Sequence, residues 1–196
     1  MKKYIAEFIG SLFLTLVVAL SLASGSAVPI PMAAGLTFGL LVYATGHISG
    51  AQINPIVTIG LWFWKKIKAK QAGLYIIAQF LGAWGAMIII KYMKVIPATV
   101  VVVNSVPVFL AEMIGSIVFT FGVAAVVSGK VRESLGGVVI GAALMVGIIL
   151  AGAVSNGTLN PAVAYGIRSF SWVYLLAPIV GSLIGMNLFR WLNKNS

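Results

Sequence analysis

The sequence contains no cysteine, no aspartate and only one histidine, His47. Without cysteine, neither a disulfide framework nor a thiolate metal site can form. No carboxylate pair, nucleophile–base set, phosphate loop or metal-ligand cluster is present, so enzyme chemistry has almost no residues to use. We therefore expect a protein that is not an enzyme and that holds no metal and no cofactor.

Charge is also scarce, because only 8% of the 196 residues are charged whereas 61% are hydrophobic. This composition is far outside the range of soluble domains. The net charge of +10 could indicate a nucleic-acid partner, but the basic residues lie in clusters between apolar runs rather than on a polar face. We expect an integral membrane protein whose surroundings are the lipid bilayer, with no nucleic-acid partner.

Six apolar stretches are long enough to cross a bilayer, which takes about 20 residues. They cover approximately 4–24, 31–48, 70–92, 107–128, 134–154 and 172–192. The first run is too long for the apolar core of a signal peptide, so we interpret it as a retained helix. Two shorter stretches, about 54–64 and 160–170, have half the required length and favour re-entrant segments. The fold class expected is all-α and integral to the membrane.

The basic residues predict the orientation. With three spans and one re-entrant segment in each half, ten of the thirteen lysines and arginines fall on one side of the membrane: Lys2, Lys3, Lys65, Lys66, Lys68, Lys70, Lys130, Arg132, Arg190 and Lys194. Only Lys91, Lys94 and Arg168 fall on the other side. The positive-inside rule then predicts that both termini are cytoplasmic.

The two halves of the chain resemble each other. Ala6-Glu7 corresponds to Ala111-Glu112, and Asn54-Pro55 corresponds to Asn160-Pro161, at offsets of 105 and 106 residues. Each half holds three spans, an odd number, so the second half must be inverted relative to the first. We predict a single channel domain over residues 1–196, with inverted repeats at about 4–92 and 107–192.

Glycines recur four residues apart within three of the expected spans. The pairs are Gly35 with Gly39, Gly137 with Gly141, and Gly181 with Gly185. Small residues at this spacing let helix backbones approach closely in lipid. We interpret the glycines as helix-packing positions in a compact bundle.

Asparagine is a strong helix N-cap and proline suits the first helical turn, so Asn54-Pro55 and Asn160-Pro161 each begin a helix. Each beginning leaves unpaired N–H groups and a partial positive charge of about half a unit. Non-helical backbone at membrane depth is tolerated only inside protein or beside a water-filled cavity. Two such helix ends that converge in mid-membrane predict a pore.

The segment from Gly46 to Pro55, GHISGAQINP, and the segment Leu159-Asn160-Pro161-Ala162 closely resemble the two signature loops of the aquaporin and aquaglyceroporin superfamily. The resemblance covers nearly the whole chain, including the Ala-Glu-x-x-Gly start of each half. It implies six transmembrane helices with two re-entrant half-helices, assembled as a homotetramer with one pore per subunit. The pore motifs would comprise Asn54, Pro55, Ile56, Asn160, Pro161 and Ala162.

The resemblance also implies roles for the loop residues. Asn54 and Asn160 would donate hydrogen bonds to the permeating molecules. Backbone carbonyls would accept from them, at Gly50, Ala51, Gln52, Ile53, Asn156, Gly157, Thr158 and Leu159. Glu7 and Glu112 would support the loop backbones, and we interpret His47 as a packing and hydrogen-bonding residue beside the first loop.

Four residues correspond to the narrow filter of such channels: Ala34, Ile148, Gly157 and Val163. Water-selective relatives usually have an aromatic residue, a histidine, a small residue and an arginine there. This filter should therefore be wide and apolar and should lack a fixed positive charge, which also predicts weaker exclusion of protons. Ile56 departs from the usual alanine and could narrow the pore centre instead.

Because pore diameter and lining groups govern selectivity, we predict a passive channel for small uncharged solutes. Candidates are water, glycerol-like polyols, urea, ammonia and neutral metalloid hydroxides. Two alternatives stay open: a secondary transporter, which shares inverted repeats and broken helices, and a closed-pore structural membrane protein. From the short loops and the lack of targeting extensions we expect a prokaryotic plasma membrane, and eukaryotic internal membranes stay open as the alternative.

Overall fold

The computed structural model describes residues 1–23, 26–97 and 100–194. Apart from one isolated bridge between Ala23 and Pro97, the regular structure of this described part is helical. The helices are α1 (Lys2–Ser21), α2 (Ile30–Ser49), α3 (Pro55–Phe63), α4 (Ala69–Tyr92), α5 (Val106–Val127), α6 (Gly136–Gly152), α7 (Pro161–Gly166) and α8 (Trp172–Leu192), with a 3-10 turn at Glu133–Leu135.

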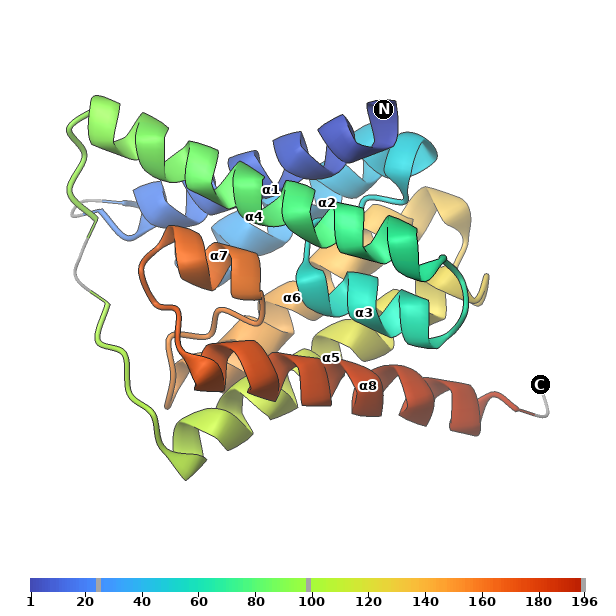
Figure 1. Ribbon diagram of the computed structural model, residues 1–196. Coiled ribbons are helices and arrows are strands. Elements are labelled where there is room, and N and C mark those ends of the chain that lie inside the picture. The colour runs from blue at the N-terminus through green and yellow to red at the C-terminus, as the bar shows by residue number, and fades with distance from the viewer. Residues whose placement is uncertain (24–25, 98–99, 195–196) are drawn as a thin grey trace.

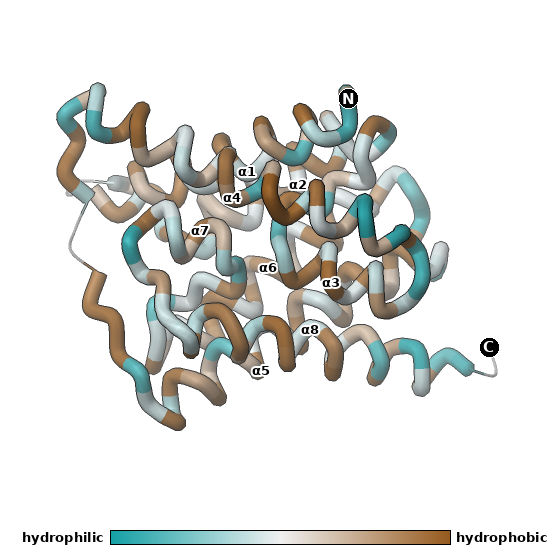
Figure 2. Tube along the Cα trace, viewed as in Figure 1, coloured by the Kyte–Doolittle hydropathy of each residue, from teal (hydrophilic) through white to brown (hydrophobic). Residues whose placement is uncertain are grey.

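The six spans expected from hydropathy are confirmed. Six of the described helices, α1, α2, α4, α5, α6 and α8, are long and apolar enough to cross a membrane. Figure 2 shows hydrophobic residues along these helices and hydrophilic residues gathered mainly at the ends of the bundle. Large apolar side chains such as Leu40, Ile77 and Leu81 are exposed on the outside, as lipid-facing residues are.

The two remaining helices are short and lie inside the bundle. Figure 1 shows α3 toward the end where the C-terminus lies, and α7 toward the end crossed by the connection between α4 and α5. Helix α7 is shorter than the stretch expected from about 160 to 170, since it ends at Gly166 and Arg168 adopts a left-handed φ of 62°.

Equivalent helices of the two halves make equivalent contacts. Helix α1 packs against α2 and α4, and α5 packs against α6 and α8 in the same way. The halves meet along α2 and α6, and each short helix contacts both α4 and α8. The short helices also contact each other, which brings their asparagine caps to the centre of the bundle.

Glycines allow the two halves to approach closely where α2 crosses α6. A Cβ atom added to Gly35 would lie 2.6 Å from the Gly141 carbonyl oxygen, and one added to Gly39 would lie 2.7 Å from that of Gly137. These separations are too short for a side chain, so the packing role predicted for the glycines is confirmed.

Candidate functional site

Each short helix begins at an asparagine that caps it. The Asn54 Oδ1 atom accepts a hydrogen bond of 3.0 Å from the Ile56 N–H. The Asn160 Oδ1 atom accepts from the Ala162 N–H at 3.0 Å and from the Val163 N–H at 3.3 Å. Proline follows each asparagine at the first helical position, where its missing N–H costs nothing. Each Asn-Pro pair therefore begins a helix with asparagine as its N-cap, as the sequence predicted.

The same two asparagines also join the halves. The Asn54 Nδ2 group donates to the Leu159 carbonyl at 2.9 Å, and the Asn160 Nδ2 group donates to the Ile53 carbonyl at 3.2 Å. An amide NH₂ group carries two N–H donors. Each asparagine therefore keeps one further N–H group at the point where the two helix ends meet.

The loops that precede the short helices have unusual backbone conformations. Ala51 and Ile53 in the first loop have φ values of 44° and 56°, and Leu159 in the second has 45°. Left-handed conformations are costly for residues with a side chain, above all for β-branched isoleucine. Such a backbone persists only where its surroundings hold it.

In the first loop, Glu7 of α1 supplies that support. Its Oε1 atom accepts from the Ser49 hydroxyl at 2.7 Å and from the Gln52 N–H at 2.9 Å. Its Oε2 atom accepts from the Ile53 N–H at 2.6 Å and from the Gln79 amide at 2.8 Å. The carboxylate is fully buried, and all four donors turn toward it.

Glu112 of α5 holds the second loop in the corresponding way. Its Oε1 atom accepts from the Ser155 hydroxyl at 2.7 Å and the Thr158 N–H at 3.0 Å. Its Oε2 atom accepts from the Leu159 N–H at 2.9 Å and from the Thr158 hydroxyl at 3.4 Å. Both carboxylates thus accept hydrogen bonds from the backbone of the pore loops, where the resemblance implies a supporting role for them.

His47 does not join these networks. Its side chain is exposed near the end of α2, and no described residue forms a hydrogen bond with it. Instead, Tyr75 and Gln79 of α4 complete the first network, since the Tyr75 hydroxyl donates to the Ser49 carbonyl at 2.9 Å. Neither residue was expected from the sequence, because neither lies in a recognisable motif.

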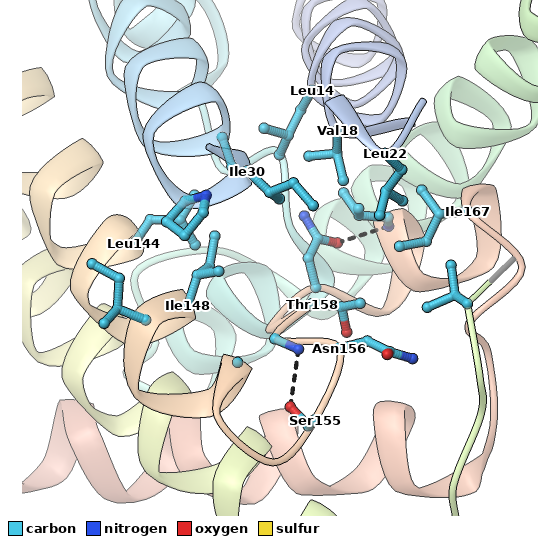
Figure 3. A pocket seen from close by; sticks show the side chains of 18 residues that line it. Leu14, Val18, Leu22, Ile30, Leu144, Ile148, Ser155, Asn156, Thr158 and Ile167 are labelled. Atoms are coloured by element: carbon cyan, nitrogen blue, oxygen red, sulfur yellow. Dashed lines mark hydrogen bonds between the residues drawn. The ribbon is translucent and has the colours of Figure 1, made fainter. Parts of the chain in front are cut away.

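A cavity of about 420 Å³ opens at the end of the bundle that carries α7. The four residues expected at the filter all line it, together with Asn160; they are Ala34, Ile148, Gly157 and Val163. The structure therefore brings the expected filter together around one space. Figure 3 shows this cavity with Ile148 on one side and the loop residues Asn156 and Thr158 beneath it.

The second loop supplies polar groups to the cavity. Asn156, Gly157 and Thr158 line it, and among the described residues no N–H or O–H group donates to their carbonyl oxygens. The Asn156 amide is itself fixed by the Val101 carbonyl at 3.0 Å and the Ser169 hydroxyl at 2.7 Å. Unpaired carbonyl oxygens need water or solute as partners. The first-loop residues Gly50, Ala51 and Gln52 are not part of this cavity.

Much of the cavity wall comes from residues that sequence reasoning missed. Leu14, Val18 and Leu22 of the α1 region line one side, and Figure 3 shows them opposite Leu144 and Ile148 of α6. Their spacing of four residues places them on one helix face, which is the signal that could have identified them. The wall of the cavity is predominantly apolar.

Ile56, considered as a possible constriction, is fully buried and packs within the main apolar core. Its carbonyl accepts a hydrogen bond of 2.8 Å from the Ser182 hydroxyl of α8. It does not line the outer cavity, whereas Asn160 does. Any effect of Ile56 on permeation would therefore act on the inner side of the asparagines.

The chain is similar to known proteins both in sequence and in fold. The family described as "Major intrinsic protein" matches residues 1–189. The chain is 31% identical to aquaporin AqpM of Methanothermobacter marburgensis over 98% of both chains. It is 30% identical to putative aquaporin NIP4-1 of Arabidopsis thaliana, over 98% of this chain and 76% of that protein. The fold resembles that of the aquaglyceroporin from Plasmodium falciparum, with a TM-score of 0.67 and 22% identity, over 99% of this chain and 95% of that one.

Proposed function

The chain belongs to the major intrinsic protein family, and from this membership we propose that it is a passive transmembrane channel for water and small uncharged solutes. The observation that carries the proposal is the meeting of two asparagine-capped helix ends at the base of a cavity lined by the filter residues. Helix N-termini and free amide N–H groups favour polar guests that can accept hydrogen bonds, and the partial positive charges oppose cations.

The filter favours solutes larger than water. Ala34 and Gly157 contribute almost no side chain, and Ile148 and Val163 add apolar surface without donors or charge. A wide and partly apolar passage admits the carbon backbone of a polyol while the loop carbonyls accept from its hydroxyls. Glycerol-like polyols therefore fit the site best, with urea, ammonia and neutral metalloid hydroxides as further candidates and water as a co-permeant.

The hydrogen bonding of the two intramembrane carboxylates argues against the alternative function, a secondary transporter. Coupled transporters use midplane sites for ions or substrate charge. Glu7 and Glu112 each accept four hydrogen bonds from loop and helix donors and are fully buried. Both are thus committed to holding the backbone, which leaves no free carboxylate for coupling within the described membrane-spanning helices.

The assembly and the orientation belong to the same proposal. The subunit would form a homotetramer in a plasma membrane, with both termini in the cytoplasm. The orientation is supported by the charge pattern. The basic connection between α3 and α4 and the C-terminal end of α8 lie at the end that would face inward, whereas the connection between α4 and α5 and the segment after α7 lie at the other. The tetramer is supported by family resemblance alone.

A solute panel in reconstituted vesicles tests the channel and its filter together. Stopped-flow measurements would compare water, glycerol and urea permeability of the natural protein and of Val163→Arg. We expect the natural protein to conduct glycerol, and the variant to lose most glycerol conduction because a long cationic side chain enters the cavity. Val163→Leu serves as the control, since it adds apolar volume without charge. A protein that accelerates no solute would support the closed-pore alternative.

A further inference from the structure

Three cations gather beside the outer entrance of the proposed pore. Lys91 and Lys94 come from the end of α4 in the first half, and Arg168 follows α7 in the second. Although they are far apart in sequence, all three line one cavity of about 510 Å³. Val100 and Ile167 line both this cavity and the filter cavity, so the two spaces adjoin.

The described part of the chain offers these cations no counter-charge. Its three acidic residues are Glu7, Glu112 and Glu133. The first two are fully buried and bonded to the pore loops, and Glu133 lies in the turn before α6, after α5 has returned to the opposite end of the bundle. Within the described residues, Lys91, Lys94 and Arg168 have no ion pair or side-chain hydrogen bond, and all three are exposed.

Backbone hydrogen bonds fix the main-chain positions of two of these three basic residues. Lys94 and Arg168 adopt left-handed φ values of 55° and 62°, each at the end of a helix. Their N–H groups donate back to the Lys91 carbonyl at 3.2 Å and to the Tyr165 carbonyl at 3.1 Å. The planar guanidinium of arginine and the ammonium of lysine are the side-chain groups that most often bind oxyanions.

We propose that this outer vestibule, defined by Lys91, Lys94 and Arg168, is a binding site for a small oxyanion, and that its occupant hinders entry of neutral solutes into the adjoining filter cavity. The ligand chemistry is a phosphate-like group, carried either by a free anion or by an anionic lipid headgroup at the membrane surface. The effect on permeation rests on the proposed channel function, whereas the binding itself does not.

Calorimetry of the full-length protein in neutral detergent, with inorganic phosphate as the titrant at constant ionic strength, tests the binding. The variant K91Q/K94Q/R168Q should bind roughly 100-fold more weakly, since it loses three basic residues and each one near a charged group contributes roughly fivefold. The matched control K65Q/K66Q/K68Q removes three charges from the opposite end and should bind phosphate as the natural protein does. Equal loss in both variants would mean general charge attraction and would overturn the site.

Permeation tests the second part. In phosphatidylcholine vesicles, phosphate added to both sides should slow glycerol flux through the natural protein and through the control variant, but not through K91Q/K94Q/R168Q. The same measurement in vesicles that contain phosphatidylglycerol identifies the source. A response that persists there indicates a free anion, and a low flux that phosphate no longer changes indicates the headgroup.

A single substitution and the phosphate dependence of glycerol flux separate the anion site from the proposed channel. If the triple variant does not fold, R168Q alone supplies the same comparison with a smaller effect. Saturating phosphate that leaves glycerol flux unchanged in phosphatidylcholine vesicles would overturn the coupling to permeation. A natural protein that binds phosphate through these residues yet conducts no solute would instead overturn the proposed channel and leave the anion site standing.

Discussion

Replacing Glu112 by glutamine should lower the stability of the protein, because both carboxylate oxygens of Glu112 accept hydrogen bonds from the backbone of the second pore loop. The Thr158 N–H donates to Oε1 and the Leu159 N–H donates to Oε2. A glutamine has one carbonyl oxygen and one NH₂ group in those places, so it can accept from only one of the two backbone donors. The other N–H would remain buried and face a donor.

A buried donor without an acceptor costs about 1–3 kcal/mol. Glu112→Gln should therefore destabilise the protein by about that amount, and Glu112→Ala, which removes both acceptors, by about 2–6 kcal/mol. The Ser155 hydroxyl adds little to this cost, because its single O–H group can donate to the Ala151 carbonyl, 3.1 Å away, instead. For a chain of this length, the alanine variant should unfold roughly 10 °C below the natural protein.

Thermal unfolding in detergent, followed by tryptophan fluorescence, should give the order natural protein, glutamine variant, alanine variant. Glu133→Gln is the control, because it removes an exposed carboxylate outside the loops and should unfold with the natural protein. Glycerol flux should fall in the same order, since the loop lines the filter cavity. A Glu112→Gln variant with unchanged unfolding temperature and flux would refute the two-oxygen support of the loop.

Three further outcomes follow from the packing and the pore. Gly35→Ala should lower the unfolding temperature, because its Cβ would lie 2.6 Å from the Gly141 carbonyl oxygen, whereas Gly73→Ala, with open space around it, should not. Asn160→Asp should keep the helix cap but replace the amide donor with a negative charge, so sodium leak into vesicles should rise; an unchanged leak would contradict a central role for the amide. The natural protein should leak protons faster than Val163→Arg, as a pH dye inside vesicles would report, because its filter lacks fixed positive charge.

The sequence predicted the membrane spans and the first short helix closely. Helix α8 begins at Trp172 and ends at Leu192, within the stretch expected, because hydropathy and interfacial aromatic residues determine where a span meets water. The prediction for α7 was wrong by several residues at its end. The helix ends there because Arg168 adopts a left-handed conformation. No local residue pattern predicted that conformation.

The candidate site was less evident from the sequence. The motifs predicted the two asparagine caps, which depend on local residues and are confirmed. The filter positions come from the resemblance and stay a prediction. The motifs did not identify Gln79 and Tyr75, which reach the first loop from α4, nor the wall formed by Leu14, Val18 and Leu22. Such contacts depend on how distant helices pack against each other, and a single sequence carries little information about that.

The reciprocal bonds between Asn54 and Leu159 and between Asn160 and Ile53 bear on how the protein is made. While only the first half has left the ribosome, the Ile53 carbonyl and the Asn54 amide lack the partners that the second half supplies. Unpaired polar groups are costly in hydrocarbon. Helix α3 should consequently reach its final depth only after α7 has been synthesised, so the innermost part of the molecule is completed last.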